Sequence, residues 1–569
     1  MKRILAMTLT FCLLCGCGAK EQGAPTEPAL TVSQPAETIP VQSIVDTEIP
    51  YVSRFENITE ITLSDGLISV DGAGETETVF ASRDIIYYED RQTYDSGYPY
   101  GEGEEWEHHS VDEASAHTVV NITAPGAYRV SGKLSQGQIR IDLGEDAYED
   151  ENAVVELILN DADITCTVAP AVLFMNVYEC DGDWSADTAK AEVDTSAAGA
   201  NLILEGENTV TGSHVAKIFK DSPEEKKLWK QDGAIYSYMS MNVFGPGKLD
   251  LTADNEGLDA ELHLTINGGD IAIRSDNDGI NTNEDGVSVT TINGGDLHII
   301  AGLGAEGDGI DSNGYLVING GTVVSAANPG ADAGLDSDLG SYINGGTVIA
   351  LGSAMDWAES DSKQVTMNLQ FAGNQSGDAA VVVTRTDGTV IFAYDPSADE
   401  VLADNYRVFS GAVISCANFH VGESYHVYVD GEIAGEDMGG IYDVTTVTDF
   451  SGGTQMAFTG TDVMMRPGGF GVGQKSDGME PPEGFEPGDR PEGMEPPEGM
   501  EMGERPEMPE GWEPGEMPEG MELPEDFDPF QIPEGGFGGK GQFSAEPGEA
   551  NTSFFMQDKV NFFSGLSSI

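Results

Sequence analysis

Short runs of alternating hydrophobic and small polar residues flank an Asn-Gly-Gly tripeptide at four places in the chain. The phrases are TINGGDIAI (265–273), TINGGDLHI (291–299), VINGGTVVS (317–325) and YINGGTVIA (342–350). Alternation with a period of two is typical of a strand with one buried face. Asn-Gly and Gly-Gly accept positive φ at little steric cost, so each phrase predicts two strands separated by a sharp corner.

The phrases recur at a nearly constant interval, since their asparagines are 26, 26 and 25 residues apart. These asparagines are Asn267, Asn293, Asn319 and Asn344. Divergent earlier copies are FGPGKLDLTA (244–253), LEGENTVTG (204–212) and LNDADITCT (159–167). A period of this length is typical of a solenoid. Leucine-rich repeats share the period, but the chain lacks their leucine ladder and helical half. We therefore expect an all-β fold, a right-handed parallel β-helix over residues 51–363, with coils stacked ~4.8 Å apart.

Residues 364–465 have a different pattern. VVVTRTDGTVIF (381–392) and SYHVYVDGEIAG (424–435) place Asp-Gly turns between alternating strands, which predicts antiparallel hairpins. An open β-helix end exposes unpaired backbone groups, so we expect these hairpins to form a C-terminal antiparallel cap of the same domain. Trp357 and Tyr342 could stack on sugar rings, although packing in the core or cap is the commoner role.

A second, acidic phrase recurs in register with the first. It reads DNEGLDAE (254–261), DNDGINTN (276–283), EGDGIDSN (306–313) and ADAGLDSD (331–338). Equivalent positions on stacked coils lie next to one another, so we expect a ladder of side-chain oxygens, interrupted at Ala333. The candidate metal ligands are Glu256, Asp259, Asp278, Asn281, Asp308, Asp311, Asp336 and Asp338.

Carboxylates at this spacing repel one another. Two of them ~5 Å apart repel by roughly 3 kcal/mol at an effective dielectric constant near 20. Ca²⁺ turns that repulsion into binding, because it accepts six to eight oxygens in irregular geometry.

His and Cys are absent from the phrases, which disfavours zinc and copper. An EF-hand loop starting at Asn281 would need an acid where Ile292 stands. A solvated Asn/Asp ladder without an ion stays open as an alternative. We expect several calcium ions.

The N-terminus has the pattern of a bacterial signal peptide over residues 1–16, with MKR followed by an apolar stretch. LCGC (14–17) has the form of a lipobox, which predicts lipidation of Cys17; an ordinary secretory signal is the alternative. Residues 17–50 are rich in Pro, Thr and Glu and are expected to form a flexible stalk. These features predict export and lipid anchoring to the outer face of the bacterial cytoplasmic membrane, at the cell surface.

Near the C-terminus, residues 466–550 repeat a Pro-Glu-Gly-Met theme. Pro and Gly interrupt helices and strands, and the acids repel one another, so this region is expected to be disordered. Residues 551–569 are apolar and receive no assignment.

The net charge of −73 excludes nucleic acid as a partner, because phosphate binding needs a basic surface. It also disfavours direct contact with anionic lipid, so the expected attachment to the membrane is through the lipid anchor alone. Outside the signal region the cysteines are Cys166, Cys180 and Cys416; a disulfide between the first two is possible, but three thiols cannot all pair.

A longer ordered series of motifs resembles a known family. ITLSDGLISVDGAG (61–74), VNITAPGAYRVSGKLSQGQIRID (120–142), VELILNDADITC (155–166), EGENTVTG (205–212), DGAIYS (232–237) and the INGG phrases follow one another. This series resembles the clostridial carbohydrate-binding β-helix family, whose founding type binds polygalacturonate and cellulose and holds calcium. The resemblance covers residues 58–460 and implies the fold, calcium and glycan binding.

The chain departs from that family at one position of the acidic phrase. Members often carry Lys or Arg after Gly-Ile, whereas this chain has Asp259, Asn281, Asp311 and Asp336. Direct pairing of this position with a uronate is therefore disfavoured, and contact through an ion is favoured.

The leading hypothesis is a cell-surface lipoprotein that binds acidic, polygalacturonate-like polysaccharide of plant or cell wall through calcium, without catalysis. A calcium-dependent lyase is one alternative, but it needs a basic residue to abstract a proton. From Leu249 to Ser362 the basic candidates are Arg274, His263 and His298, in strand phrases where structural roles are commoner. A pectin hydrolase is a second alternative, since acids are abundant. A surface structural or assembly protein stiffened by calcium is a third.

Overall fold

The computed structural model describes most of the chain between the two low-complexity regions. The described residues are 40–44, 49–65, 67–88, 108–182, 185–186, 188–219, 227–354, 356–402, 405–461 and 550–569. The expected signal peptide, Cys17, most of the expected stalk and nearly all of the region expected to be disordered lie outside these residues. By its internal contacts the chain divides into Met1–Val41 and Gln42–Ile569, and every element described below lies in the second unit.

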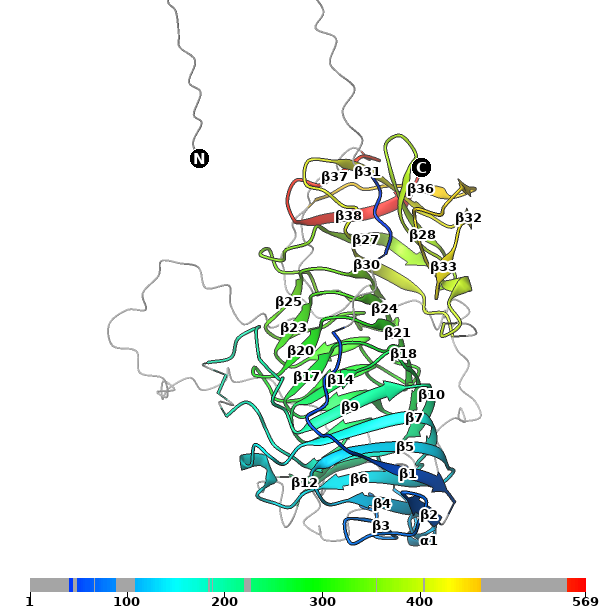
Figure 1. Cartoon of the computed structure of the whole chain (residues 1–569). Coiled ribbons are helices and arrows are strands. Elements are labelled where there is room, and N and C mark those ends of the chain that lie inside the picture. The colour runs from blue at the N-terminus through cyan, green and yellow to red at the C-terminus, as the bar shows by residue number, and fades with distance from the viewer. Residues whose placement is uncertain are drawn as a thin grey trace, which may run out of the picture. The chain divides into compact units, whose positions relative to one another are not determined.

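The strands on either side of the Asn-Gly-Gly corners, and of the equivalent corners in two divergent earlier copies, form two parallel arrays (Figure 1). Array 1 precedes the corners and comprises β9 (Ala200–Glu205), β14 (Met241–Phe244), β17 (His263–Ile266), β20 (Val289–Ile292), β23 (Tyr315–Ile318) and β25 (Gly340–Ile343). Array 2 follows them and comprises β10 (Glu207–Gly212), β15 (Lys248–Ala253), β18 (Asp270–Ser275), β21 (Asp296–Ile300), β24 (Thr322–Ala326) and β26 (Thr347–Gly352). Within both arrays the INGG strands pair in the register of the repeat, so that Thr265 lies opposite Thr291.

The corner itself needs glycine. In each INGG phrase the second glycine has positive φ, for example 95° at Gly295. A Cβ atom at Gly295 would lie 2.8 Å from the carbonyl oxygen of Gly269 on the preceding repeat. The close approach of successive corners therefore excludes larger residues.

A third array is an eight-stranded sheet that is parallel except for its first pair. In order it comprises β3 (Val79–Ser82), β4 (Thr118–Ile122), β6 (Gly137–Asp142), β8 (Val172–Asn176), β13 (Gly233–Ser237), β16 (Glu256–Ala260), β19 (Ile280–Thr282) and β22 (Ile310–Ser312). The last three strands carry the acidic phrases.

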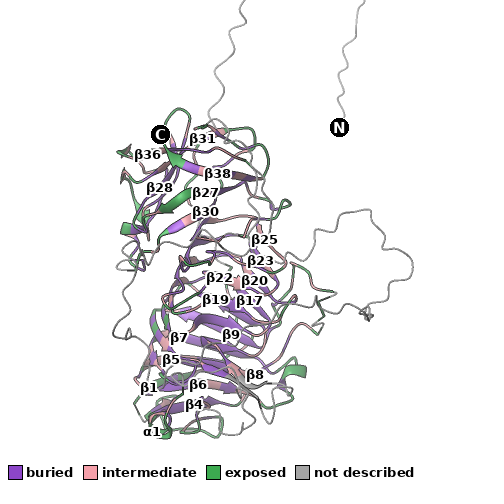
Figure 2. Cartoon of the chain, turned by 180° about the vertical axis from the view of Figure 1, so that it is seen from behind, coloured by how far each residue is buried: buried purple, intermediate pink, exposed green. Residues whose placement is uncertain are grey.

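The hydrophobic core lies among the inward-facing rows of these arrays. Leu264, Ile266, Ile271, Ile292 and Ile310 are all fully buried. Figure 2 shows the array strands largely in purple, the colour of buried residues. The alternating pattern of the sequence corresponds to alternating burial in β15 and β18, whereas every residue of β16, β17 and β24 is buried.

Further elements complete the N-terminal half. β1 (Ile58–Ser64) pairs antiparallel with β2 (Leu67–Val70) and parallel with β5 (Gly126–Leu134), which pairs with β7 (Val155–Thr165). The other elements are α1 (Val111–Ala116), a 3-10 turn (Ala147–Glu149), and the hairpin of β11 (Val215–Phe219) and β12 (Lys227–Gln231). Two stretches of the expected stalk contact the folded unit, since Gln42 bonds to Asn418 and Ile49 to Asn267.

The C-terminal strands join the same large sheet. β30 (Phe409–Ser415) pairs antiparallel with both β26 and β27 (Thr366–Gln375). Further strands are β28 (Val381–Arg385), β29 (Val390–Tyr394), β31 (Ser424–Val429), β33 (Asp437–Met438), β34 (Ile441–Tyr442) and β36 (Thr454–Ala457). A 3-10 turn (Pro396–Ala398) and the pair β32 (Glu432–Ala434) and β35 (Asp449–Ser451) lie among them.

The final residues, which the sequence left unassigned, form β37 (Phe554–Phe555) and β38 (Val560–Ser568). β38 runs parallel to β27, with Thr366 opposite Val560. It also pairs antiparallel with β36. The last stretch of the chain is therefore part of the C-terminal sheet.

The predicted architecture is wrong. The chain is all-β, but over its described part a 26-stranded sheet mixes parallel and antiparallel pairs, and the strands form no closed solenoid with a separate cap. The physical reason is that a repeat specifies which neighbouring strands pair, not how a sheet ends. At β26 the edge of array 2 pairs with antiparallel β30, so the sheet continues into the C-terminal strands.

Candidate metal centre

The backbone register of the third array aligns the acidic phrases. Asp259 lies opposite Asn281, and Asn281 lies opposite Asp311. Beyond β22 the alignment continues, because the Asp336 N–H donates to the Ile310 carbonyl at 2.8 Å. We call this aligned set of acidic phrases the acidic ladder. It brings together Asp259, Asn281, Asp311 and Asp336, as the spacing of the repeat predicted.

A second row of the ladder runs through Glu256, Asp278 and Asp308. Gly257 N–H donates to the Asp278 carbonyl, and Gly279 N–H donates to the Asp308 carbonyl, both at 3.0 Å. The carboxylates in this row accept backbone bonds as well, since Asp278 Oδ1 lies 2.7 Å from Asp308 N. The row ends at Ala333, whose N–H donates to Asp308 Oδ1 at 2.5 Å.

The glycine shared by the acidic phrases permits this close stacking. A Cβ on Gly279 would lie 2.6 Å from the Gly309 carbonyl oxygen, and one on Gly257 would lie 2.4 Å from the Gly279 carbonyl oxygen. Only glycine therefore fits at the position between the two rows of oxygens.

Asp232, Glu256 and Asp259 form the most enclosed cluster. One oxygen from each lies within 4.8 Å of the others. Glu256 Oε2, Asp259 Oδ2 and Asn281 Oδ1 are buried and accept no hydrogen bond. Each such oxygen costs about 1–3 kcal/mol of desolvation unless something binds it. The donor set is oxygen only, which fits a hard cation such as Ca²⁺.

Sequence reasoning missed two residues at this site, Asp232 and Lys230. Asp232 precedes β13, in the DGAIYS phrase that lies one repeat upstream, but Gly233 lies opposite Glu256 and is therefore out of register with the glycine of the acidic phrases. Lys230 comes from β12, outside the repeat. Its Nζ lies 2.8 Å from Asp232 Oδ2 and also donates to Asn283 Oδ1. Asn283 in turn donates to Asp259 Oδ1 at 2.5 Å, so one fixed positive charge is held beside the ladder.

The ladder carboxylates are shifted toward their protonated forms. Burial, and then the Glu256 carboxylate, raises the pKa of Asp259 and of Asp278 well above the usual range. Burial and the neighbouring Asp336 raise the pKa of Asp308 to about 8 and that of Asp311 to about 7. Near neutral pH these oxygens therefore take up either protons or a cation.

Burial decreases along the ladder. Glu256, Asp259, Asp278 and Asn281 are buried, whereas Asp308, Asp311 and Asp336 are partly exposed and Asp338 is exposed. The ladder thus has an enclosed end at Asp232 and an open end at Asp338. An ion at the enclosed end would contact protein oxygens, whereas an ion at the open end could also contact a ligand.

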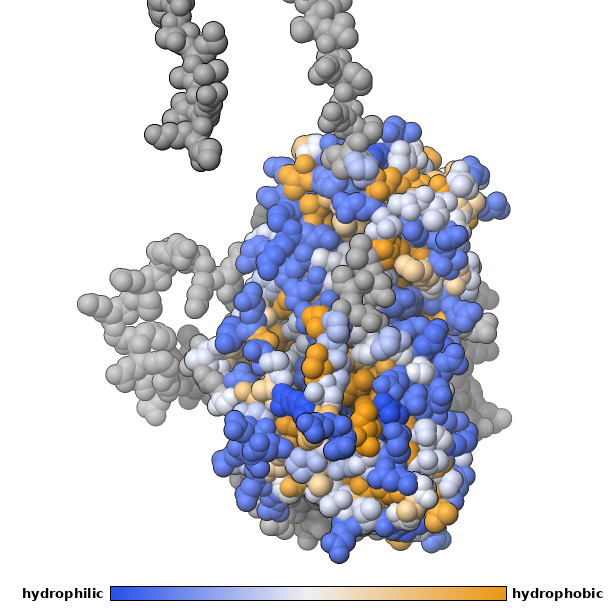
Figure 3. All heavy atoms as spheres, in the orientation of Figure 1, coloured by the Kyte–Doolittle hydropathy of each residue, from blue (hydrophilic) through white to orange (hydrophobic). Residues whose placement is uncertain are grey.

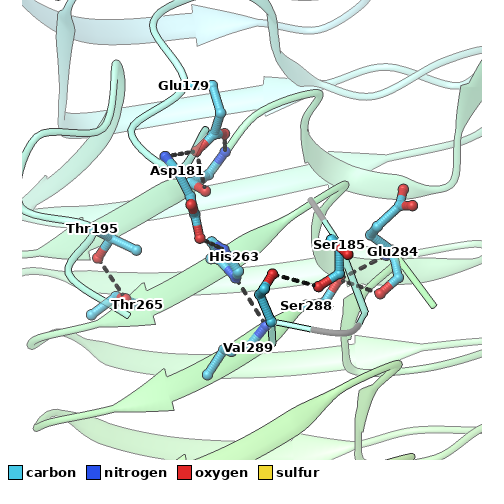
Figure 4. Close-up of polar contacts among 11 residues, drawn as sticks. Glu179, Asp181, Ser185, Thr195, His263, Thr265, Glu284, Ser288 and Val289 are labelled. Carbon is cyan, nitrogen blue, oxygen red and sulfur yellow. Dashed lines mark hydrogen bonds and ion pairs between the residues drawn. The ribbon is translucent and has the colours of Figure 1, made fainter. Parts of the chain in front are cut away.

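The basic residues considered for catalysis have structural partners. Arg274 pairs with Asp250 at 2.6 Å. His263 Nδ1 accepts from Val289 N at 3.1 Å, which leaves Nε2 to donate to Asp181 at 3.3 Å (Figure 4). Burial lowers the pKa of His263, consistent with a neutral ring.

His298 lies between two carboxylates. Its Nδ1 is 2.9 Å from Asp399 Oδ2 and its Nε2 is 3.2 Å from Asp296 Oδ1. Burial alone would lower the pKa of His298, but these two contacts raise it to about 10. The residue is a buried cation that joins β21 to the segment after the 3-10 turn at Pro396–Ala398.

The other sequence candidates also have clear positions. Cys166, Cys180 and Cys416 are free thiols, so the possible disulfide is not formed. Trp357 packs edge-to-face on Phe562, with 5.2 Å between ring centroids. Tyr342 is partly exposed and lies 6.1 Å from the ring of Tyr315.

Comparison with known proteins identifies the family of this chain. Residues 116–418 match the family model described as "Carbohydrate-binding domain-containing protein", which is more than half of the chain. The chain belongs to this carbohydrate-binding family. The matched residues include arrays 1 and 2 and the whole acidic ladder. The match supports a polysaccharide-binding role for this chain.

Other comparisons add little. No curated protein sequence matches the chain. One similar solved structure is titled "Structure of the polysaccharide lyase-like protein from C. thermocellum, Gadolinium derivative". It shares 19% identity over 51% of this chain and 93% of its own, with a TM-score of 0.29. Over the described residues, no helix is long and apolar enough to span a membrane.

Proposed function

We propose that this carbohydrate-binding protein holds calcium along the acidic ladder and uses it to bind acidic, polygalacturonate-like polysaccharide, without catalysis. The observation that carries the proposal is the set of buried oxygens without hydrogen-bond partners at Glu256, Asp259 and Asn281. A hard cation can contact several such oxygens at once, whereas a single shared proton joins only two of them.

The two ends of the ladder have different roles in this proposal. At the enclosed end, Asp232, Glu256 and Asp259 would hold calcium, which would relieve charge repulsion in the third array. At the open end, Asp336 and Asp338 would hold calcium, to which a uronate carboxylate could supply further oxygen ligands. Since the chain carries a net charge of −73, an ion between protein and polyuronate is needed to offset their repulsion.

The state of the basic groups near the ladder supports binding without bond cleavage. Elimination from a uronate needs a base with a free lone pair close to the metal. Lys230 is a basic side chain beside the ladder, but its ammonium group donates to Asp232 and Asn283. Arg274, His263 and His298 are held by the partners given above.

The test uses the full chain after removal of its signal peptide. Migration in native gels containing polygalacturonate is compared with calcium and with a chelator, while absorbance reports unsaturated uronate products. We expect retardation with calcium, its loss with chelator, and no product. Retardation that chelator leaves unchanged would refute the calcium contact, and product formation would identify a lyase. Calcium-dependent melting without any retardation would instead favour a calcium-stiffened structural protein.

The proposal includes attachment to the cell surface through lipid on Cys17. The test is metabolic labelling with a fatty-acid analogue in a bacterial host, followed by fractionation. We expect label and membrane association for the natural chain and neither for Cys17→Ser. A labelled or membrane-bound Cys17→Ser protein would refute the anchor.

A further inference from the structure

Residues 550–569 supply a strand that joins two parts of the C-terminal sheet. β38 lies between β27, its parallel neighbour, and β36, its antiparallel neighbour. Among the described strands, the pairings of β38 are the ones that link β26, β30 and β27 to β36, β31, β28 and β29. Figure 1 shows β38 in red next to β27, which comes from a much earlier part of the chain. Without β38, both β27 and β36 would have an unpaired edge.

The groove between β27 and β36 is filled by large apolar side chains of this segment. Phe554, Met556, Phe563 and Leu566 are all at most 4% exposed. The rings of Phe554 and Phe563 each lie 4.8 Å from the ring of Phe458, measured between centroids. Full burial of such a side chain contributes about 1.5–3 kcal/mol. An empty groove would therefore expose a large apolar surface, and the sheet is complete only with the segment in place.

Buried amides set the alignment of the segment in the groove. Asn368 of β27 donates from Nδ2 to the Asn561 carbonyl at 3.1 Å, and Asn561 Nδ2 donates to the Thr366 carbonyl at 3.4 Å. Both asparagine side chains are buried. A shift of β38 by one residue would break both bonds and turn Phe563 away from the core. The groove is thus specific for this segment in one register.

The connection to the segment is far longer than its two ends require. Phe458 and Asn551 exchange two backbone hydrogen bonds, at 3.0 and 2.9 Å, so the chain leaves the sheet and returns to it at neighbouring points. Residues 462–549 lie between these points. A hairpin connection needs only about two to five residues, whereas a chain of this length can span up to roughly 290 Å. The segment can therefore reach the same groove on a second copy.

The surface beside the segment is partly apolar. Figure 3 shows orange, hydrophobic residues among blue ones over the C-terminal strands. Val421 and Phe555 are 51% and 49% exposed, and the segments that carry them are joined by the hydrogen bond from Gly422 N–H to the Met556 carbonyl. Exposed apolar side chains at this place favour contact with another copy.

We propose that residues 550–569 are exchanged between two copies of the chain, so that β38 of each copy fills the groove between β27 and β36 of the other. The contacts of β38 are the same in an exchanged dimer as in a monomer, so exchange costs little contact energy. The advantage of docking within one chain falls as the connection lengthens. An exchanged dimer presents two acidic ladders to one polymer chain, a consequence that rests on the function proposed above.

The test uses the full chain without its signal peptide, unfolded in urea and refolded at several concentrations. Gln370 lies opposite Ser564, so a chain with Gln370→Cys and a mass-tagged chain with Ser564→Cys are refolded together and oxidised. We expect a heterodimer linked through the two introduced thiols. Its yield should rise with concentration, and with salt, because salt screens the repulsion between two strongly negative copies.

The double variant Gln370→Cys/Ser564→Cys is the matched control. Oxidised as a monomer, it holds β38 in its own groove and should stay monomeric until the disulfide is reduced. Dimers that the oxidised double variant still forms would place the interface elsewhere and overturn the inference.

A second measurement needs no variant. Natural and isotope-labelled chains should give mixed dimers in native mass spectrometry after joint refolding, but not after simple mixing of the folded chains, because exchange requires β38 to leave its groove. Monomers at every concentration, or mixed dimers that form equally well on simple mixing, would overturn the inference. Neither calcium nor polysaccharide is used, so this proposal and the proposed function fail separately.

Discussion

Asp259 lies directly opposite Asn281 on neighbouring parallel strands, and each has one buried side-chain oxygen that accepts no hydrogen bond. Two such oxygens in adjacent, equivalent positions are unusual, because nearly all buried polar atoms are paired in folded proteins. Under the calcium proposal, the arrangement is unfavourable without a cation and favourable with one. Predictions about the ladder therefore have opposite signs in calcium and in chelator.

The first prediction concerns Asp259→Asn. In chelator the variant should melt at the same temperature as the natural chain or higher, because a buried carboxylate beside Glu256 has been removed. In calcium it should gain less stability than the natural chain, which is expected to gain about 2.7 kcal/mol at 100 times the dissociation constant. Calorimetry over a calcium titration measures both effects.

Glu306→Gln is the matched control for Asp259→Asn. Glu306 belongs to the same acidic phrase as Asp308, but it is exposed. Its calcium response should equal that of the natural chain. A natural-chain melting temperature unchanged by calcium, or an unaltered calcium response in Asp259→Asn, would contradict the assignment.

The second prediction concerns pH in the absence of calcium. The pKa of Asp308 is raised to about 8 and that of Asp311 to about 7, from 3.8 in an exposed chain. Between these values the folded state keeps protons that the unfolded state has lost, so stability should fall as pH rises from about 4 to about 8. Calcium bound at these oxygens would replace the protons, so it should flatten the decline and be bound with proton release.

Melting in chelator across this pH range measures the effect. Asp311→Asn should show a shallower decline than the natural chain, whereas Glu306→Gln should show the same one. A melting temperature that rises with pH in chelator would contradict the raised pKa values.

The third prediction separates the two ends of the ladder. Asp338 is exposed at the open end, and Asp259 is buried at the other. Asp338→Asn should weaken calcium-dependent binding of polygalacturonate several-fold while most of the calcium-induced rise in melting temperature is retained. Gel retardation and calorimetry on one preparation measure both quantities. Equal loss of stabilisation in Asp338→Asn and Asp259→Asn would show that the ends do not differ.

Local repeats of the sequence predicted the parts of the structure that depend on local pairing. The spacing of Asn267, Asn293 and Asn319 predicted parallel register in array 1, and the acidic phrases predicted that Asp259, Asn281 and Asp311 would align. Both follow because strands one repeat apart have little alternative but to pair with each other.

Features set by distant parts of the chain were not predictable in this way. The antiparallel pairing of β26 with β30 and the parallel pairing of β27 with β38 join segments far apart in sequence, without a repeat to reveal them. Lys230 and Asp232 reach the acidic ladder from outside the regular phrases. The hydrophobic pattern identifies strands, but it does not identify the partner of an unpaired edge.

The fourth prediction concerns the buried pair of His298 and Asp399, which joins residues 101 positions apart. Because the pKa of His298 is raised from 6.5 to about 10, its contribution to stability is complete below pH 6.5 and is lost as pH rises through about 10. Asp399→Asn leaves the imidazolium with Asp296 alone and should cost about 3–5 kcal/mol near neutral pH. Its urea midpoint should also depend less on pH in this window. Glu400→Gln, an exposed neighbour, should behave like the natural chain. If Asp399→Asn kept both the midpoint and its pH dependence, the pair would not be the link between β21 and the C-terminal strands.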